Sequence, residues 1–134
     1  MKQGIQTNFP HEVLRKEGCY FFCLAEWAAR VRGNDFTEDE IIMLFDAAHK
    51  AELVKKDVTI LLPPQLMNLF LGRHEFNIVD AVNEPPREKR YIIYLEKPGY
   101  GHFLLFDNGD IWDPLDPSRP GAVGYKPVSY REII

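Results

Sequence analysis

One helix dominates the interpretation of this sequence, and it spans Gly18-Cys19-Tyr20-Phe21-Phe22-Cys23-Leu24-Ala25-Glu26-Trp27-Ala28-Ala29-Arg30-Val31-Arg32. The stretch is apolar on nearly all sides, and its polar residues gather toward its far end. Gly33 follows it, and glycine is the residue at which helices most readily end. Because a helix that is apolar all round lies inside a protein, the sequence predicts a buried helix from Gly18 to about Arg32.

Two further helices are predicted downstream. Thr37 and Glu40 have the spacing of a capping box, which predicts a helix from this point to about Ala51. Acidic residues crowd its first turn, where the helix dipole favours them. Pro63-Pro64 then introduces a short helix over Gln65–Leu71, which Gly72 ends.

The second half of the chain has the pattern of strands. Extended segments are predicted over Glu75–Asp80, Tyr91–Leu95 and Pro127–Ile133. Between them, Asn108-Gly109 separates two apolar runs, which is the strongest short-range signal for a β-hairpin. Helices first and an antiparallel sheet afterwards predict an α+β fold.

Composition and charge exclude several classes of protein. With 134 residues, 46% hydrophobic and 27% charged, the chain is expected to form one domain over residues 1–134 with a real core. Two cysteines are too few for a secreted disulfide framework. The net charge of -4 argues against nucleic acid as a partner, and the basic cluster Arg87–Arg90 is interpreted as a solvated loop.

Neither a signal peptide nor a membrane partner is expected. No long apolar run follows the charged start of the chain, and no stretch reaches the roughly 18 apolar residues that span a bilayer. We therefore expect a cytoplasmic protein.

Cys19 is the residue with the clearest chemical potential. Gly18 permits a tight entry turn, so the cysteine falls at the first residue of the buried helix, where unpaired backbone N–H groups and the helix dipole stabilise a thiolate. The same N–H groups can hold the oxyanion of an acyl-transfer intermediate. The alternative is an inert, buried Cys19. Cys23, one turn further into the helix, is interpreted as a packing residue.

His102 differs from the other histidines. His11, His49 and His74 have no ligand spacing and are expected at the surface or as helix caps, so neither a metal nor another cofactor is predicted. His102 instead follows a glycine-rich segment at the start of the hairpin.

A two-residue turn at Asn108-Gly109 sets the register of this hairpin. It places His102 opposite Leu115 and Asp113 opposite Leu104, so that His102 and Asp113 are diagonal neighbours roughly 7–8 Å apart at Cα. Asp116 lies past the strand end and stays a second candidate, because a bulge would change the parity. Cys19, His102 and Asp113 together have the logic of a cysteine-hydrolase triad.

The sequence also resembles the papain-like cysteine peptidase clan, and within it the small bacterial and phage branch similar to the bacteriocin-processing peptidases. The resemblance is carried by Gly18-Cys19-x-x-x-Cys23-Leu24-Ala25, Tyr100-Gly101-His102-Phe103, Trp112-Asp113-Pro114 and Val123-Gly124-Tyr125-Lys126-Pro127-Val128-Ser129-Tyr130-Arg131. It implies a papain-like fold in which the nucleophile helix and two further helices pack on a small antiparallel sheet. Cys19 would be the nucleophile, His102 the base and then the acid, and Asp113 the group that orients His102.

One part of the family pattern is missing. Papain-like enzymes usually carry a glutamine a few residues before the cysteine, where it completes the oxyanion hole, and Val13 to Gly18 contains none. Gln6, Gln3 and Asn8 are the nearest candidates.

Three functions fit these residues. The first is a peptidase or amidase that hydrolyses a peptide or a peptidoglycan-like amide through an acyl-enzyme on Cys19. The alternatives are a catalytically inactive papain-fold module that binds a partner, and an acyl transferase that uses the same triad.

Overall fold

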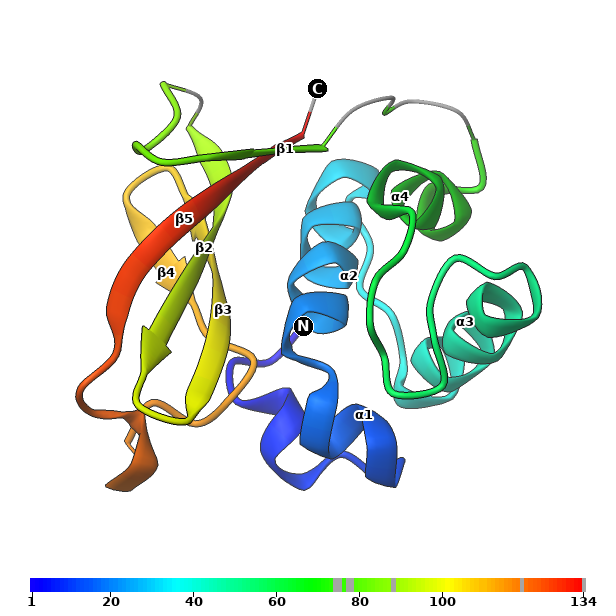
Figure 1. The fold of residues 1–134 in the computed structure, drawn as a ribbon. Coiled ribbons are helices and arrows are strands. Elements are labelled where there is room, and N and C mark those ends of the chain that lie inside the picture. Colours follow the sequence, from blue (N-terminus) through cyan, green and yellow to red (C-terminus); the bar gives the residue numbers. More distant parts are fainter. Residues whose placement is uncertain (74–75, 77–78, 88, 119, 134) are drawn as a thin grey trace.

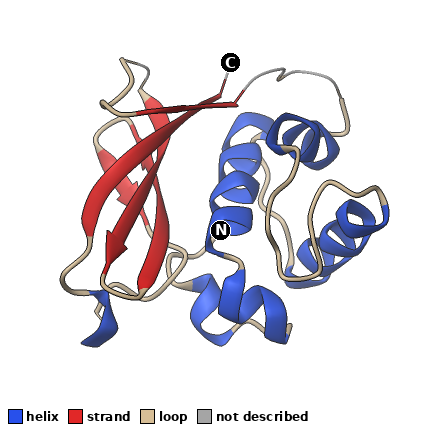
Figure 2. Ribbon diagram, in the orientation of Figure 1, coloured by secondary structure: helices blue, strands red, loops and turns tan. Residues whose placement is uncertain are grey.

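The computed structural model of the chain describes residues 1–73, 76, 79–87, 89–118 and 120–133. Helices gather on one side of the molecule and strands on the other (Figure 2). The helical side comprises η1 (Ile5–Asn8), α1 (Glu12–Glu17), α2 (Cys19–Arg32), α3 (Glu38–Lys50) and α4 (Pro63–Leu71). The strands are β1 (Val79–Val82), β2 (Arg90–Lys97), β3 (Tyr100–Asp107), β4 (Asp110–Trp112) and β5 (Lys126–Ile133), with the 3-10 turn η2 (Pro120–Ala122) before β5.

The buried helix predicted from the sequence is α2. It begins at Cys19 and ends at Gly33, whose φ of 79° is the left-handed conformation of a helix C-cap. Figure 1 shows α2 between the sheet and the other helices, next to α4. Phe21, Phe22 and Leu24 are fully buried. An apolar surface on all sides of the helix is required by this position, because α2 contacts core residues from both halves of the chain.

The two downstream helices also form where they were predicted. At the start of α3, Glu40 N donates to Thr37 Oγ1 over 3.1 Å, and Thr37 N donates to Glu40 Oε1 over 3.0 Å. The capping box is therefore confirmed. α4 begins at Pro63, two residues earlier than predicted, because proline fits the first positions of a helix, where no N–H is needed.

The short helix α1 was not predicted. Its N-cap is His11, whose Nδ1 accepts a hydrogen bond from Leu14 N over 3.4 Å. The expectation that His11 is a cap residue is therefore confirmed, although histidine is not a common N-cap and gave no signal for the helix.

The strands form one antiparallel sheet in the order β1-β5-β2-β3-β4, so the α+β class is confirmed. β2 and β5 extend slightly beyond the predicted strands. β1 includes the last two residues of the predicted strand Glu75–Asp80 and continues to Val82, while residues 75, 77 and 78 lie outside the described residues.

The hairpin between β3 and β4 has the predicted register. Asn108 and Gly109 have φ values of 52° and 94°, as a two-residue hairpin turn with two left-handed residues requires. Leu105 pairs with Trp112, and Phe106 pairs with Ile111. This pairing continues the predicted alignment and brings the segment after β4 alongside the beginning of β3.

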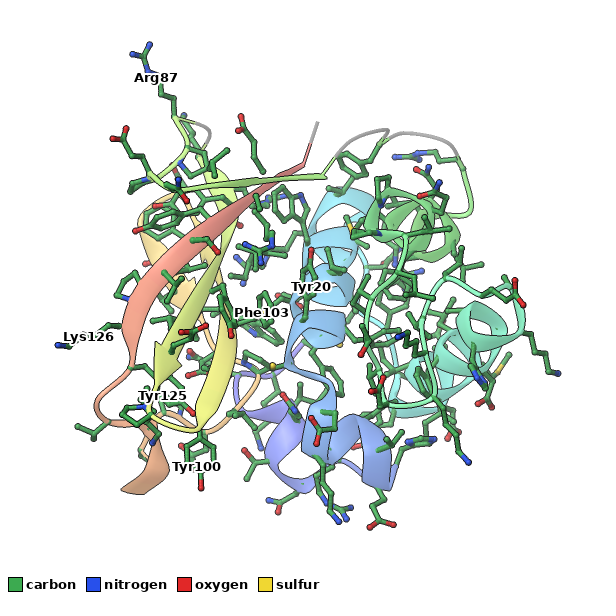
Figure 3. All side chains as sticks on the ribbon, viewed as in Figure 1. Tyr20, Arg87, Tyr100, Phe103, Tyr125 and Lys126 are labelled. Atoms are coloured by element: carbon green, nitrogen blue, oxygen red, sulfur yellow. The ribbon has the colours of Figure 1, made fainter. Side chains whose placement is uncertain are left out.

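The basic loop before β2 only partly matches its prediction as a solvated cluster. Arg87 is exposed and points away from the molecule (Figure 3). Arg90, however, begins β2 and is half-buried, and its Nε lies 3.1 Å from Asp107 Oδ1. Within the described part of the chain, no helix has both the length and the apolar character needed to cross a bilayer.

Candidate active site

Cys19 occupies the first position of α2 and opens onto a cleft of about 540 Å³. Gly18, the N-cap, is needed here because a Cβ at this position would collide with Leu14 O. The close approach lets α1 turn directly into α2. The thiol is partly exposed, and the N–H of Cys19, at the first position of the helix, has no acceptor within α2. The alternative of a fully buried Cys19 is therefore wrong.

His102 and Asp113 form a buried pair next to this helix start. His102 Nε2 donates a hydrogen bond to Asp113 Oδ1 over 2.8 Å, and only 5% of His102 and 9% of Asp113 are exposed. Leu115 N donates to the same carboxylate oxygen over 2.9 Å. The predicted proximity of His102 and Asp113 is confirmed, because the turn at Asn108-Gly109 has the expected geometry.

The other ring nitrogen of His102 is not used by Asp113. Nδ1 is buried and has no hydrogen-bond partner of ordinary geometry among the described residues, yet Cys19 is close enough to interact with the ring. Burial alone would lower the pKa of His102. The hydrogen bond to Asp113 and the negative charges of Asp113 and Cys19 outweigh burial and raise this pKa to about 9. Such a pKa keeps the ring of His102 as an imidazolium at neutral pH.

Asp116, the second candidate from the sequence, has a different role. Its Oδ1 accepts hydrogen bonds from Ser118 N over 2.9 Å and from Ser118 Oγ over 2.7 Å, which is the geometry of a local turn. Asp116 N donates to Thr7 Oγ1 over 2.9 Å. Of the two carboxylates, Asp113 is therefore the one that holds His102.

The N-terminal segment anchors Asp113, which the sequence did not indicate. Gly4 N donates to Asp113 O over 2.8 Å, and Gln6 N donates to Pro114 O over 2.8 Å. Asp113 N donates to Gln3 Oε1 over 3.2 Å. Backbone groups from the start of the chain thus fix the segment that carries the carboxylate. No local pattern reveals such a long-range pairing.

The three candidates for the oxyanion hole differ in their exposure and in their hydrogen bonds. Asn8 is exposed, and Gln3 uses its side-chain oxygen on Asp113. Gln6 is 1% exposed, and its Nε2 donates to Arg15 O over 3.1 Å, at the end of α1 just before Cys19. Since an amide nitrogen carries two N–H groups, one N–H of Gln6 stays available near the start of α2. Of the three, Gln6 therefore has the best position.

Comparison with known proteins supplies a family. The model of a family described as "Protein of unknown function, DUF261" matches residues 1–131. The chain belongs to the DUF261 family. No curated protein matches it, and no solved structure does so either.

Cys23 of this DUF261 chain is fully buried, as expected for a packing residue. Burial raises the pKa of its thiol well above the usual value, and the neighbouring charges of Cys19 and Asp113 act in the same direction. A thiol held in this way stays protonated and unreactive, so the two cysteines differ in reactivity.

The remaining histidines do not join the site. His49 is exposed at the end of α3 and stacks on Phe45 with ring centroids 6.4 Å apart. His74 lies outside the described residues. Among the described residues, no group of three His, Cys, Asp or Glu side chains has the arrangement of a metal site.

Aromatic rings line the cleft beside Cys19. Tyr20 stacks on Phe103 with ring centroids 4.3 Å apart, and the two rings lie between α2 and the sheet (Figure 3). Tyr94 packs on Phe103 with centroids 4.8 Å apart. Burial raises the pKa of Tyr20 to about 12, so this ring stays neutral. Trp27 and Trp112, which are also near Cys19 or Asp113 in sequence, belong to the core instead.

Proposed function

We propose that this DUF261 chain is a papain-like cysteine hydrolase, a peptidase or amidase that works through an acyl-enzyme on Cys19. One observation carries the proposal: the buried ring of His102 is held by Asp113 at one nitrogen and lies close enough to Cys19 to interact with it. This is the arrangement in which a histidine activates a thiol and later delivers a proton. The sequence resemblance to papain-like peptidases supports the same fold and the same roles.

In the proposed reaction, the thiolate of Cys19 attacks the carbonyl carbon of the amide, and a C–S bond forms. The imidazolium of His102 gives its proton to the leaving nitrogen as the C–N bond breaks, which leaves a thioester and a free amine. Neutral His102 then takes a proton from water, whose oxygen attacks the thioester. Release of the acid restores the thiolate and the imidazolium. Asp113 keeps the ring oriented throughout.

In the proposed reaction, two N–H groups stabilise the oxyanion of the tetrahedral intermediate. They are the backbone N–H of Cys19 and the second amide N–H of Gln6. Gln6→Met keeps the length of the side chain but removes the donor, and should lower kcat by roughly 100- to 1000-fold. Asn8→Ala is the matched control, because Asn8 is exposed. An unchanged kcat in Gln6→Met would show that Gln6 does not donate a hydrogen bond to the oxyanion.

The first experiment measures the reactivity of Cys19. Iodoacetamide is applied across pH 5 to 9, and mass spectrometry distinguishes labelling of Cys19 from labelling of Cys23. We expect rapid labelling of Cys19 already below the pH at which a free thiol reacts, and no labelling of buried Cys23. Cys19→Ala and His102→Ala should then abolish hydrolysis of a peptide library. Labelling no faster than a model thiol, together with no effect of Cys19→Ala on any activity, would refute the proposal.

Product analysis separates the alternatives. With water as the acceptor the thioester yields a free acid, and with an added amine an acyl transferase yields a new amide. A Cys19 that is activated but never turns over any amide would instead indicate a binding module that has kept the site.

A further inference from the structure

The cleft at Cys19 continues into a second hollow. Glu17 and Asp57 line both of them, so these two carboxylates stand where the spaces meet. The second hollow has a volume of about 710 Å³ and lies between α1 and α3, where His11, Phe45 and His49 contribute to its wall. Together the two spaces form a groove that leads from the nucleophile past the end of α1.

The part of this groove next to Cys19 is acidic. Among the described residues that line the cleft, Glu17 and Asp57 are charged, and none is a lysine or an arginine. Hydrogen bonds from Thr59 lower the pKa of Asp57, so its carboxylate stays ionised. Both of these bonds go to Asp57 Oδ1, over 3.1 and 2.7 Å. Within the described part of the chain, its Oδ2 accepts no hydrogen bond and is available to a ligand.

Two of the nearby cations are engaged elsewhere, whereas Lys56 lines the second hollow together with Asp57 but does not line the cleft at Cys19. Arg131 lies against the rings of Tyr94 and Phe103 and donates to Ser129 Oγ over 2.7 Å, and it is not among the residues that line the cleft. Lys16 lines only the second hollow and is paired with Glu12 at 2.9 Å.

Apolar side chains form about half of the wall of the cleft. Tyr94 and Phe103 form one side, and the loop that carries Val58 and Ile60 contributes to the other. Lys55 N donates to Thr59 O over 2.9 Å, which closes this loop and sets Asp57 at the edge of the groove. An apolar wall with a carboxylate at its rim suits a side chain that has an aliphatic stem and a cationic head.

We infer that the substrate is a polypeptide with a lysine or arginine beside the bond that is cut. This inference rests on the proposed function, since it assigns a specificity to the same site. The basic side chain lies along the aromatic wall and reaches Glu17 and Asp57. The chain continues from there into the hollow beside Phe45. A small amide would fill only one of the two spaces, whereas a polypeptide fills both.

The first experiment tests the charge at Cys19 without a substrate. Two methanethiosulfonate reagents of similar size, one with a trimethylammonium group and one with a sulfonate, react with Cys19 to give a mixed disulfide and methanesulfinate. The rates are compared at low ionic strength, where charges are least screened. The ratio of the cationic to the anionic rate should fall roughly tenfold in Glu17→Gln/Asp57→Asn. The amide oxygen introduced by Asp57→Asn can still accept the hydrogen bonds of Thr59.

The matched control is Glu12→Gln, which removes a carboxylate that lines only the second hollow and should leave the ratio unchanged. If the ratio of the cationic to the anionic rate is the same in the wild type and the double variant, Glu17 and Asp57 do not make the cleft acidic. Circular dichroism checks that the double variant is folded, and Glu17→Gln alone, at an exposed residue, gives the same test with a smaller expected change.

The second experiment tests the polypeptide. A positional-scanning hexapeptide library is bound to Cys19→Ala, so that binding is measured without hydrolysis. Lysine and arginine should be preferred over glutamine at one position by roughly tenfold, and this preference should disappear in Cys19→Ala/Glu17→Gln/Asp57→Asn. No preference, or a preference that survives in the triple variant, would overturn the inference.

The outcomes distinguish this inference from the proposed function. If the wild type prefers basic peptides but hydrolyses none of them, the acidic groove is supported and the proposed hydrolase activity is rejected. If the wild type hydrolyses peptides without a preference for lysine or arginine, the hydrolase activity is supported and the assignment of a basic substrate is rejected.

Discussion

At the scale of single residues, the position of one proton on His102 governs the site. The pKa of this ring is raised to about 9, above the usual value of about 6.5 for a free histidine. A raised pKa means that the folded state holds the proton more tightly than the unfolded chain. His102 therefore contributes stability that is complete below about pH 6.5 and is lost as the pH rises through 9.

This coupling predicts the titration of His102 in a variant without the thiol. In Cys19→Ala the interaction of His102 with Cys19 is absent, so the pKa of His102 should fall below that of the wild type. NMR of the ring protons as a function of pH measures the change. The exposed ring of His49 serves as an internal reference. An identical titration of His102 with and without Cys19 would show that the two groups do not interact.

A second prediction compares the carboxylates of the same segment. Asp113→Asn keeps an oxygen that accepts from His102 Nε2, so it should retain part of the hydrolysis rate while the pKa of His102 falls. Asp113→Ala leaves the ring without an orienting partner and should lower kcat by about a hundredfold or more. Asp116→Ala, which removes the carboxylate of the turn at Ser118, should match the wild type in kcat. A large loss of kcat in Asp116→Ala would mean that the orienting carboxylate is misassigned.

At the scale of elements, the junction of α1 and α2 sets the position of the nucleophile. Gly18→Ala would press a methyl group into Leu14 O, so the two helices must separate. We expect a loss of about 1–3 kcal/mol in the free energy of unfolding and slower alkylation of Cys19. Thermal unfolding and iodoacetamide labelling measure the two effects. Lys16→Ala, at an exposed position of the same helix, should change both only slightly.

Local chemistry explains which elements the sequence predicts. The Asn108-Gly109 turn and the capping box of α3 are each specified by a few adjacent residues, so both were predicted with their details. α1 is short, largely polar and capped by a histidine, and Leu14 is its one buried residue. Its formation depends on packing against distant parts of the chain, which a local pattern does not contain.

The candidate site follows the same rule. Cys19, His102 and Asp113 could be selected because a helix start and a hairpin register place them. The choice of Gln6 over Gln3 and Asn8 could not be made, because it depends on how η1 and α1 fold back on the segment after β4. The proximity of Glu17 and Asp57 likewise depends on how the end of α1 meets the loop that carries Asp57.

At the scale of the whole molecule, α2 is the element that joins the two halves. It packs on β3 on one side and on α4 on the other. Its amide protons should therefore exchange with solvent only through global unfolding, whereas those of α1 should exchange through local opening and much faster. Native-state hydrogen exchange followed by mass spectrometry measures both. Equal protection of α1 and α2 would contradict this description.

The division of the site between the two halves of the chain also has a consequence during translation. The thiol lies on α2, near the start of the chain, and its base and orienting carboxylate lie on β3 and directly after β4. A ribosome therefore synthesises the nucleophile long before the groups that activate it. Under the proposed function, a nascent chain carries a dormant cysteine, and the hydrolase switches on only when the hairpin has left the exit tunnel and docked on the helix.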